Sequence, residues 1–316
     1  MKLLEHDVPP SGLAEAARSG SADAAPGGLA EAAPNAWAEA APGGLAEAAP
    51  SAWPTNPLAV VASFINKTLV IAEMEARKLL HDPTEVLTRS VQPALWLLIF
   101  GQVFTRLHAI PTGGLTYIEF MAPGILAQSV LFISIFYGIA VIWERDLGIL
   151  HKFLASPTPR TALVLGKALS AGVRALTLVV IIYLLAVVLG VRMNWNPLAL
   201  LGVLFTALLG AAFFSTMSLI IACLVKSRDR FMGIGQVLTM PLFFASNAIY
   251  PIEIMPAWLQ VISHANPLTY EVDALRAMML AQGTSTFGLG LDFLVLIVAT
   301  TVLVIIAGKL YPSVAV

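Results

Sequence analysis

Residues Met121–Trp143 form the run MAPGILAQSVLFISIFYGIAVIW, which contains no charged side chain. A helix needs roughly 20 residues to cross the hydrocarbon core of a bilayer. This run is therefore long enough to span a membrane, and five other runs share its apolar character. We predict six membrane-spanning helices, at Ser90–Leu107, Met121–Trp143, Ala168–Val191, Leu198–Val225, Phe231–Tyr250 and Leu291–Leu310.

The composition supports a membrane protein. Of the 316 residues, 58% are hydrophobic and only 12% are charged, whereas soluble domains carry about 25% charged residues. So little charge cannot coat a water-facing surface, so much of the exterior must face lipid. The predicted fold class is an all-α polytopic membrane protein. The net charge of −1 gives no indication of a nucleic-acid partner, and the single cysteine, Cys223, excludes a disulfide framework within the chain.

Residues 1–55 differ from the rest. The stretch Ala25–Trp37 (APGGLAEAAPNAW) recurs as Ala41–Trp53 (APGGLAEAAPSAW). Proline and glycine interrupt each possible helical turn, and few large apolar side chains remain to offset the entropy of ordering. We predict a disordered cytoplasmic extension over 1–55, followed by a transmembrane domain over 56–316. A docking role for the two tryptophan-containing repeats is the alternative.

A charged amphipathic stretch begins at Asn56-Pro57, a favourable helix start. Its apolar residues fall near helical spacing, but Glu73, Arg77 and Lys78 interrupt them. Several charges make a spanning helix costly, so we predict a helix that lies along the membrane interface.

The lysines and arginines between the predicted spans are unevenly distributed, and cytoplasmic loops carry the excess. One side holds Arg106, Arg192 and Arg276. The other side holds Lys67, Arg77, Lys78, Arg89, Arg145, Lys152, Arg160, Lys167, Lys226, Arg228, Arg230 and Lys309. This bias predicts that both termini are cytoplasmic, which agrees with an even number of spans.

The predicted cytoplasmic segment after the second span is WERDLGILHKFLASPTPR, residues 143–160. Its first half can form a short amphipathic helix with Leu147, Leu150 and Leu154 on one face, and Ser156–Pro159 ends it. A partner that pushes on such a helix would move two spans together. An ordinary solvated loop is the alternative, and the composition alone favours it slightly.

The predicted external segment, Ile249–Leu289, is unusually apolar. Pro241, Pro251 and Pro256 are expected to break it, and Trp258 and Tyr270 are aromatic residues suited to the interface. We predict short helices that dip into the outer leaflet and return, either as a lid on a pathway or as packing.

Two polar side chains, Arg174 and Gln236, fall within predicted spans, and such residues are candidates for function. Arg174 is close enough to the cytoplasmic end to reach water, which we favour over substrate contact. The chain has no phosphate-binding loop, because Thr161 replaces the first glycine before Gly166-Lys167. Paired histidines and converging catalytic side chains are also absent from the sequence. It therefore predicts no enzyme, and any uphill transport needs energy from a partner.

Five stretches occur in the order found in ABC-2 type permeases. They are ARKLLHDP, VQPALWLLIFGQVF, APGI, ERDLGILHKFLASPTPR and YPIEIMPAWLQVISHANPLTYEVDALR. From Leu58 to the C-terminus the chain resembles this family, most closely its daunorubicin-resistance-like drug and lipid exporters. The repeat tail lies outside the resemblance.

The resemblance implies a six-span permease of the plasma (inner) membrane, in contact with membrane lipid. It would pair with a second permease copy, identical or related, and bind a cytoplasmic ABC ATPase subunit. ATP and magnesium would bind that subunit, with no cofactor on this chain. The expected function is export of an amphipathic drug-like or lipid substrate. A polysaccharide or glycolipid exporter, or a passive channel or membrane scaffold, is the alternative.

The resemblance also assigns roles to residues. The implied ATPase-coupling loop contains Glu144, Arg145, Asp146, Gly148, Leu150, Phe153, Leu154, Pro157 and Arg160. The implied interface helix beside it contains Glu73, Arg77 and Lys78. The implied external gate contains Tyr250, Pro251, Pro256, Trp258, Asn266, Pro267, Tyr270 and Arg276.

Overall fold

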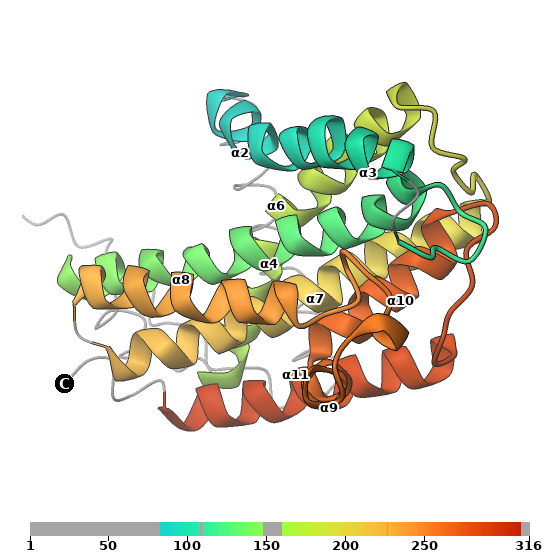
Figure 1. Cartoon of the computed structure of the whole chain (residues 1–316). Coiled ribbons are helices and arrows are strands. Elements are labelled where there is room, and N and C mark those ends of the chain that lie inside the picture. Colours follow the sequence, from blue (N-terminus) through green and yellow to red (C-terminus); the bar gives the residue numbers. More distant parts are fainter. Residues whose placement is uncertain (1–82, 108–109, 148–159, 226, 311–316) are drawn as a thin grey trace, which may run out of the picture. The chain divides into compact units, whose positions relative to one another are not determined.

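The computed structural model describes residues 83–107, 110–147, 160–225 and 227–310, and their regular structure is helical (Figure 1). The long helices are α4 (Tyr117–Asp146), α6 (Arg160–Val188), α7 (Pro197–Leu224), α8 (Arg228–Phe244) and α11 (Leu289–Leu310). Before them come α2 (Pro83–Leu95), the π-helix η1 (Trp96–Gly101) and α3 (Gln102–Leu107). Between α8 and α11 lie the 3-10 helix η2 (Ile252–Ile254), α9 (Ala257–Ala265) and α10 (Pro267–Met279). The all-α prediction is confirmed for these residues.

Among the described residues, four helices are long and apolar enough to cross a membrane: α4, α6 from Val164 onward, α7 and α11. They correspond to the second, third, fourth and sixth predicted spans. Helix α6 begins at Arg160, earlier than the predicted Ala168, and α4 begins at Tyr117 rather than Met121. Hydropathy does not detect the first turns of these helices, because charged residues such as Glu119 and Arg160 lower it although the backbone is helical.

The other two predicted spans are helical but interrupted or short. The first is a continuous helical run from Pro83 to Leu107 with the π-helix in its middle. The fifth, α8, has 17 residues and ends at Phe244 rather than Tyr250. Pro241, expected to break the external segment, lies inside α8. A proline disturbs the turn before it rather than the turn after it, and α8 continues for three residues beyond Pro241 to Phe244. Six crossings therefore stay a prediction.

Helix α4 lies at the centre of the described bundle. Its most apolar window is 76% buried, against 22% for α11. It packs on α6, α7, α8 and α10, and Figure 1 shows it between the α2–α3 run and α11. A helix that is apolar on all sides is suited to such a position.

Close backbone approach fixes α4 against the turn that follows α8. A methyl group added at Gly124 would lie 2.7 Å from the Cα atom of Ala248, so only glycine fits there. The Tyr117 hydroxyl donates a hydrogen bond to the carbonyl of Ile249 at 3.1 Å in the same turn. Small residues at helix interfaces allow such contact in membrane proteins.

The segment between α8 and α11 folds into short helices, as predicted. Helix α10 packs on α4, α7 and α11, and Leu268, Val272 and Leu275 are fully buried in the core. Placement of these helices in the outer leaflet stays a prediction. The repeat tail over 1–55 and the predicted interface helix lie outside the described residues.

Candidate functional site

Ion pairs join three helices at the end of the bundle where α4 stops and α6 and α8 begin. Lys167 of α6 pairs with Glu144 of α4. The Arg228 Nη2 atom of α8 lies 2.8 Å from the Asp146 Oδ2 atom of α4. The Arg228 guanidinium also lies over the Trp143 ring, 5.0 Å from its centroid. The last turn of α4 is thus attached to both neighbours.

These pairs are partly exposed, since the Asp146 side chain is 38% accessible and that of Arg228 is 48% accessible. Exposed ion pairs contribute about 0–1 kcal/mol to stability. Their main consequence is geometric, because they fix the position of the end of α4 relative to α6 and α8.

At the opposite end, Glu119 accepts hydrogen bonds from two segments. Its carboxylate accepts the backbone N–H and the hydroxyl of Thr116, each at 2.9 Å. It also accepts the Arg192 Nε–H at 2.8 Å from the turn between α6 and α7. Glu119 is only 3% exposed, and its charge raises the pKa of Arg192 above the usual value. The start of α4 is thereby fixed to the α6–α7 turn.

The same turn pairs with the end of α10. The Asn194 N–H donates to the Met279 carbonyl and the Ala281 N–H donates to the Arg192 carbonyl, both at 2.9 Å. These bonds flank an isolated bridge between Met193 and Leu280.

Arg276 of α10 is buried and holds the turn after α8. Its Nη2 atom donates to the Asn247 carbonyl at 2.7 Å, and its guanidinium lies 3.9 Å from the centroid of the Phe120 ring of α4. Asn266, the cap of α10, donates from Nδ2 to the Leu242 carbonyl at 2.7 Å. Helix α10 therefore contacts α8 and α4 through specific polar bonds.

Two buried aspartates close the loop between α10 and α11. The Ser285 hydroxyl lies 2.8 Å from Asp273 Oδ2 and 2.9 Å from Asp292 Oδ2. Asp273 also accepts the backbone N–H groups of Thr286 at 2.7 Å and Phe287 at 3.0 Å. The loop backbone is thus fixed to both helices.

Glu271 of α10 is fully buried, and its carboxyl oxygens have no hydrogen-bond partner in the described part of the chain. The carboxyl group lies against Gly210 of α7, where a larger residue would collide with it. Glycine at this position makes room for the acid.

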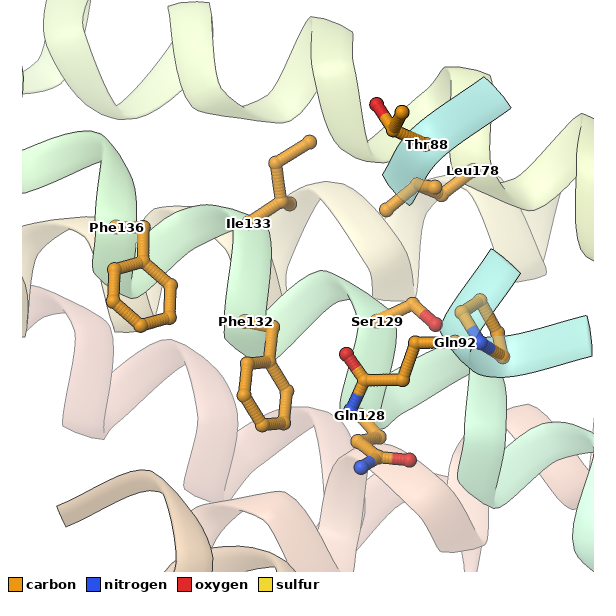
Figure 2. A pocket seen from close by; sticks show the side chains of 9 residues that line it. Thr88, Gln92, Gln128, Ser129, Phe132, Ile133, Phe136 and Leu178 are labelled. Carbon is orange, nitrogen blue, oxygen red and sulfur yellow. The ribbon is translucent and has the colours of Figure 1, made fainter. Parts of the chain in front are cut away.

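A cavity of about 420 Å³ opens between α2, α4 and α6. Its lining residues are Thr88, Gln92 and Pro93 of α2, Gln128, Ser129, Phe132, Ile133 and Phe136 of α4, and Leu178 of α6. In Figure 2 the polar ends of Gln92, Gln128 and Ser129 lie near one another, and the rings of Phe132 and Phe136 extend the lining along α4. Helical spacing explains this face, because residues four apart share one side of a helix.

A comparison with protein families identifies the chain. The profile of the family described as ABC-2 type transporter matches residues 66–280, more than half of the sequence. The chain belongs to the ABC-2 type transporter family. It is accordingly a membrane subunit of a transport system, with several helices suited to crossing the bilayer.

Individual relatives of this ABC-2 permease agree. It is 30% identical over 215 residues to a putative transport permease ycf38 of Cyanophora paradoxa, which covers 67% of this chain and 74% of the relative. It is 25% identical to the daunorubicin resistance ABC transporter permease protein DrrB1 of Streptomyces coeruleorubidus, and this match covers 66% of the chain and 72% of the relative. It is 28% identical to nodulation protein J of Neorhizobium galegae, and this match covers 62% of the chain and 74% of the relative.

Part of the predicted coupling loop of the permease is visible. Glu144, Arg145 and Asp146 lie in the last turn of α4, and Arg145 pairs with Asp146 at 3.2 Å. Arg160 is the first residue of α6. The other predicted residues, Gly148, Leu150, Phe153, Leu154, Pro157, Glu73, Arg77 and Lys78, lie outside the described residues.

The predicted gate residues lie across η2, α9 and α10. Pro251 and Pro256 precede η2 and α9, and Asn266-Pro267 begins α10. The Tyr250 hydroxyl donates to the Phe244 carbonyl at 2.5 Å, and burial raises its pKa. The Tyr270 hydroxyl donates to the His264 carbonyl at 2.7 Å. Trp258 is 66% exposed, which suits a side chain that meets lipid.

The two predicted intramembrane polar residues have different surroundings. The Arg174 guanidinium lies over the Tyr137 ring of α4, 5.1 Å from its centroid, and the Tyr137 hydroxyl donates to Ser170 at 2.9 Å. Gln236 is exposed on α8. Neither lines the cavity.

The sequence analysis missed Glu119 and the two cavity glutamines. A signal existed for Glu119, because Thr116 and Glu119 have capping-box spacing before an apolar run. For Gln92 and Gln128 the sequence offers only polar residues inside apolar runs, and their proximity depends on the packing of α2 on α4.

Proposed function

We propose that this chain is the membrane subunit of an ATP-driven exporter, crossing the membrane six times and working as a dimer with a cytoplasmic ABC ATPase on each half. The family match carries this proposal, because members of the family generally work with an ABC ATPase. The ion-paired end of α4 supports it, since the predicted coupling loop begins there.

The polar contacts suggest how motion would pass through the subunit. A push on the coupling loop would move the last turn of α4, and the Asp146–Arg228 pair would carry it to α8. The far end of α8 leads into the turn held by Arg276 of α10. The ATPase side would thus be linked to the predicted external helices through one rigid helix.

We propose an amphipathic drug-like or lipid molecule as the substrate. A relative named for daunorubicin resistance supports this class. The predominantly apolar spans support it as well, because they offer few polar groups for a strongly hydrated substrate.

Co-purification of an ATPase subunit tests the function. The permease, solubilised from native membranes and captured by affinity, is expected to bring down an ABC ATPase identified by mass spectrometry. The double change Leu150→Asp and Phe153→Asp is expected to remove it, because charges replace two apolar side chains of the predicted coupling loop. The matched control, Ala281→Asp with Gln282→Asp, places two charges at exposed positions of the opposite end and should retain the ATPase. Folded wild-type protein without any ATPase would favour a passive channel or scaffold.

A charge exchange tests the link between α4 and α8. Asp146→Arg or Arg228→Asp alone places like charges together, and each is expected to reduce the ATP-induced change in amide exchange of residues 249–265 about twofold to fivefold. That range corresponds to the coupling of up to about 1 kcal/mol that an exposed ion pair contributes. The double exchange should restore most of the change, because it rebuilds the pair with reversed signs. Equal responses in all variants would show that this pair carries no motion.

A further inference from the structure

The cavity between α2, α4 and α6 has the size of a small-molecule site. Its volume of about 420 Å³ falls within the range of roughly 300–1,000 Å³ typical of ligand pockets. It combines polar groups near α2 with aromatic rings along α4, as Figure 2 shows.

Two of the polar side chains that line this cavity are glutamines, Gln92 of α2 and Gln128 of α4. Gln128 is 3% exposed, and neither its amide nor that of Gln92 has a hydrogen-bond partner among the residues that the structure describes. Buried polar groups are nearly always paired, because an unpaired one costs stability. The Ser129 hydroxyl, in contrast, donates to the Ile125 carbonyl at 2.7 Å. Two amides therefore remain available to a ligand that both donates and accepts hydrogen bonds.

The rest of the lining is apolar. The rings of Phe132 and Phe136 are nearly parallel, with centroids 6.3 Å apart, and Ile133 and Leu178 are buried beside the cavity. This surface suits an acyl chain or a flat ring system.

Charge limits the choice of ligand. None of the described lining side chains is charged, so an ionised head would lose its hydration without gaining a counter-ion. Arg174 lies one helical turn from Leu178 on α6 and adds positive charge near this region, which opposes a cation.

We propose that this cavity binds the uncharged, hydrogen-bonding head of an amphipathic molecule through Gln92 and Gln128, with the apolar part of that molecule on Phe132 and Phe136. The ligand is taken to be the molecule that the proposed exporter carries, and to that extent the assignment rests on the proposed function.

Photolabelling of the purified permease in nanodiscs tests this site without any ATPase. The probe is a monoacylglycerol with a diazirine in its acyl chain, and labelled peptides are located by mass spectrometry. Labelling is expected in the α4 segment 128–136. Unlabelled monoacylglycerol should suppress it at a concentration about tenfold lower than an alkyltrimethylammonium of the same chain length, a ratio that one or two hydrogen bonds provide.

Two substitutions locate the contact. Gln128→Leu removes the buried amide at similar volume, and Gln92→Leu removes the exposed one, where a folding defect is least expected. Each should reduce labelling of 128–136 severalfold. Gln236→Leu on α8 removes an exposed amide outside the cavity and should leave labelling unchanged.

Three results would overturn the assignment: labelling outside α2, α4 and α6, equal competition by the cation, or full labelling in both cavity variants. If an ATPase co-purifies with the permease but the cavity is not labelled, only this assignment is wrong. If the cavity is labelled but no ATPase co-purifies with the permease, only the proposed function is wrong.

Discussion

Gly124→Ala is expected to destabilise the permease by about 2 kcal/mol or more. The new methyl group would meet the backbone of Ala248, which cannot rotate away as a side chain can. Overpacking of this kind typically costs about 1–3 kcal/mol. Because α4 is the most buried of the four candidate spans, the displacement would reach its other neighbours. Heating followed by size-exclusion chromatography in detergent should show a midpoint about 5 °C lower, given a few degrees per kcal/mol in a chain of this size.

Gly233→Ala provides the matched control. Gly233 also lies inside a helix, α8, but a methyl group there would meet nothing within 4 Å. Alanine is favoured over glycine in helices by about 1 kcal/mol, so this variant should be neutral or slightly more stable. If the two variants behaved alike, the contact between α4 and the turn after α8 would be wrong.

Glu119→Ala is expected to cost about 2–3 kcal/mol. It leaves the Thr116 N–H and the Arg192 guanidinium without their acceptor and removes the capping box of α4. The Thr116 hydroxyl can still cap the helix, so the larger loss is that of the bonds from Thr116 to the buried carboxylate, since a hydrogen bond to a charged group contributes about 1.5–3 kcal/mol. Amide exchange should rise in residues 112–120 and 190–196, because the carboxylate holds both segments.

Glu253→Ala is the control for that change. Glu253 is exposed in η2, and substitutions at such surface positions usually change stability by less than about 0.5 kcal/mol. The stability of Glu119→Gln should lie between those of Glu119→Ala and Glu253→Ala, since the amide oxygen of the glutamine still accepts one hydrogen bond. Similar exchange in Glu119→Ala and Glu253→Ala would contradict the role of Glu119 in fixing the start of α4 to the α6–α7 turn.

The amino-acid sequence predicts the helical class, the family and most of the long helices. Length and hydropathy suffice for α7 and α11, whose observed bounds lie within two residues of the predicted ones. They fail at α8, where Pro241 is accommodated and the helix stops soon afterwards. The short helices between Pro251 and Met279 follow from proline spacing and the Asn-Pro start of α10.

The parts that could not be predicted depend on which helix faces which. Lipid and a neighbouring helix are equally apolar, so hydropathy does not tell the faces of a spanning helix apart. The cavity needs α2 and α4 in one register, and the Glu119–Arg192 pair joins residues from separate loops. The predicted coupling loop, in contrast, is assigned from local motifs alone, and the structure describes only its ends.

The π-helix at Trp96–Gly101 sets the phase of the first predicted span. The buried positions of this span include Pro93, Leu97 and Gly101, which recur every fourth residue. Phe104 follows them and packs on Tyr117 of α4. In a regular α-helix a step of four advances the direction by about 40°, so the two steps from Pro93 to Gly101 would turn the stripe by about 80°. A π turn holds one extra residue and sets the stripe back by about 100°. An uninterrupted α-helix would therefore turn Pro93 and Gly101 about 80° apart, whereas the π-helix returns the two residues to one buried face of the first predicted span.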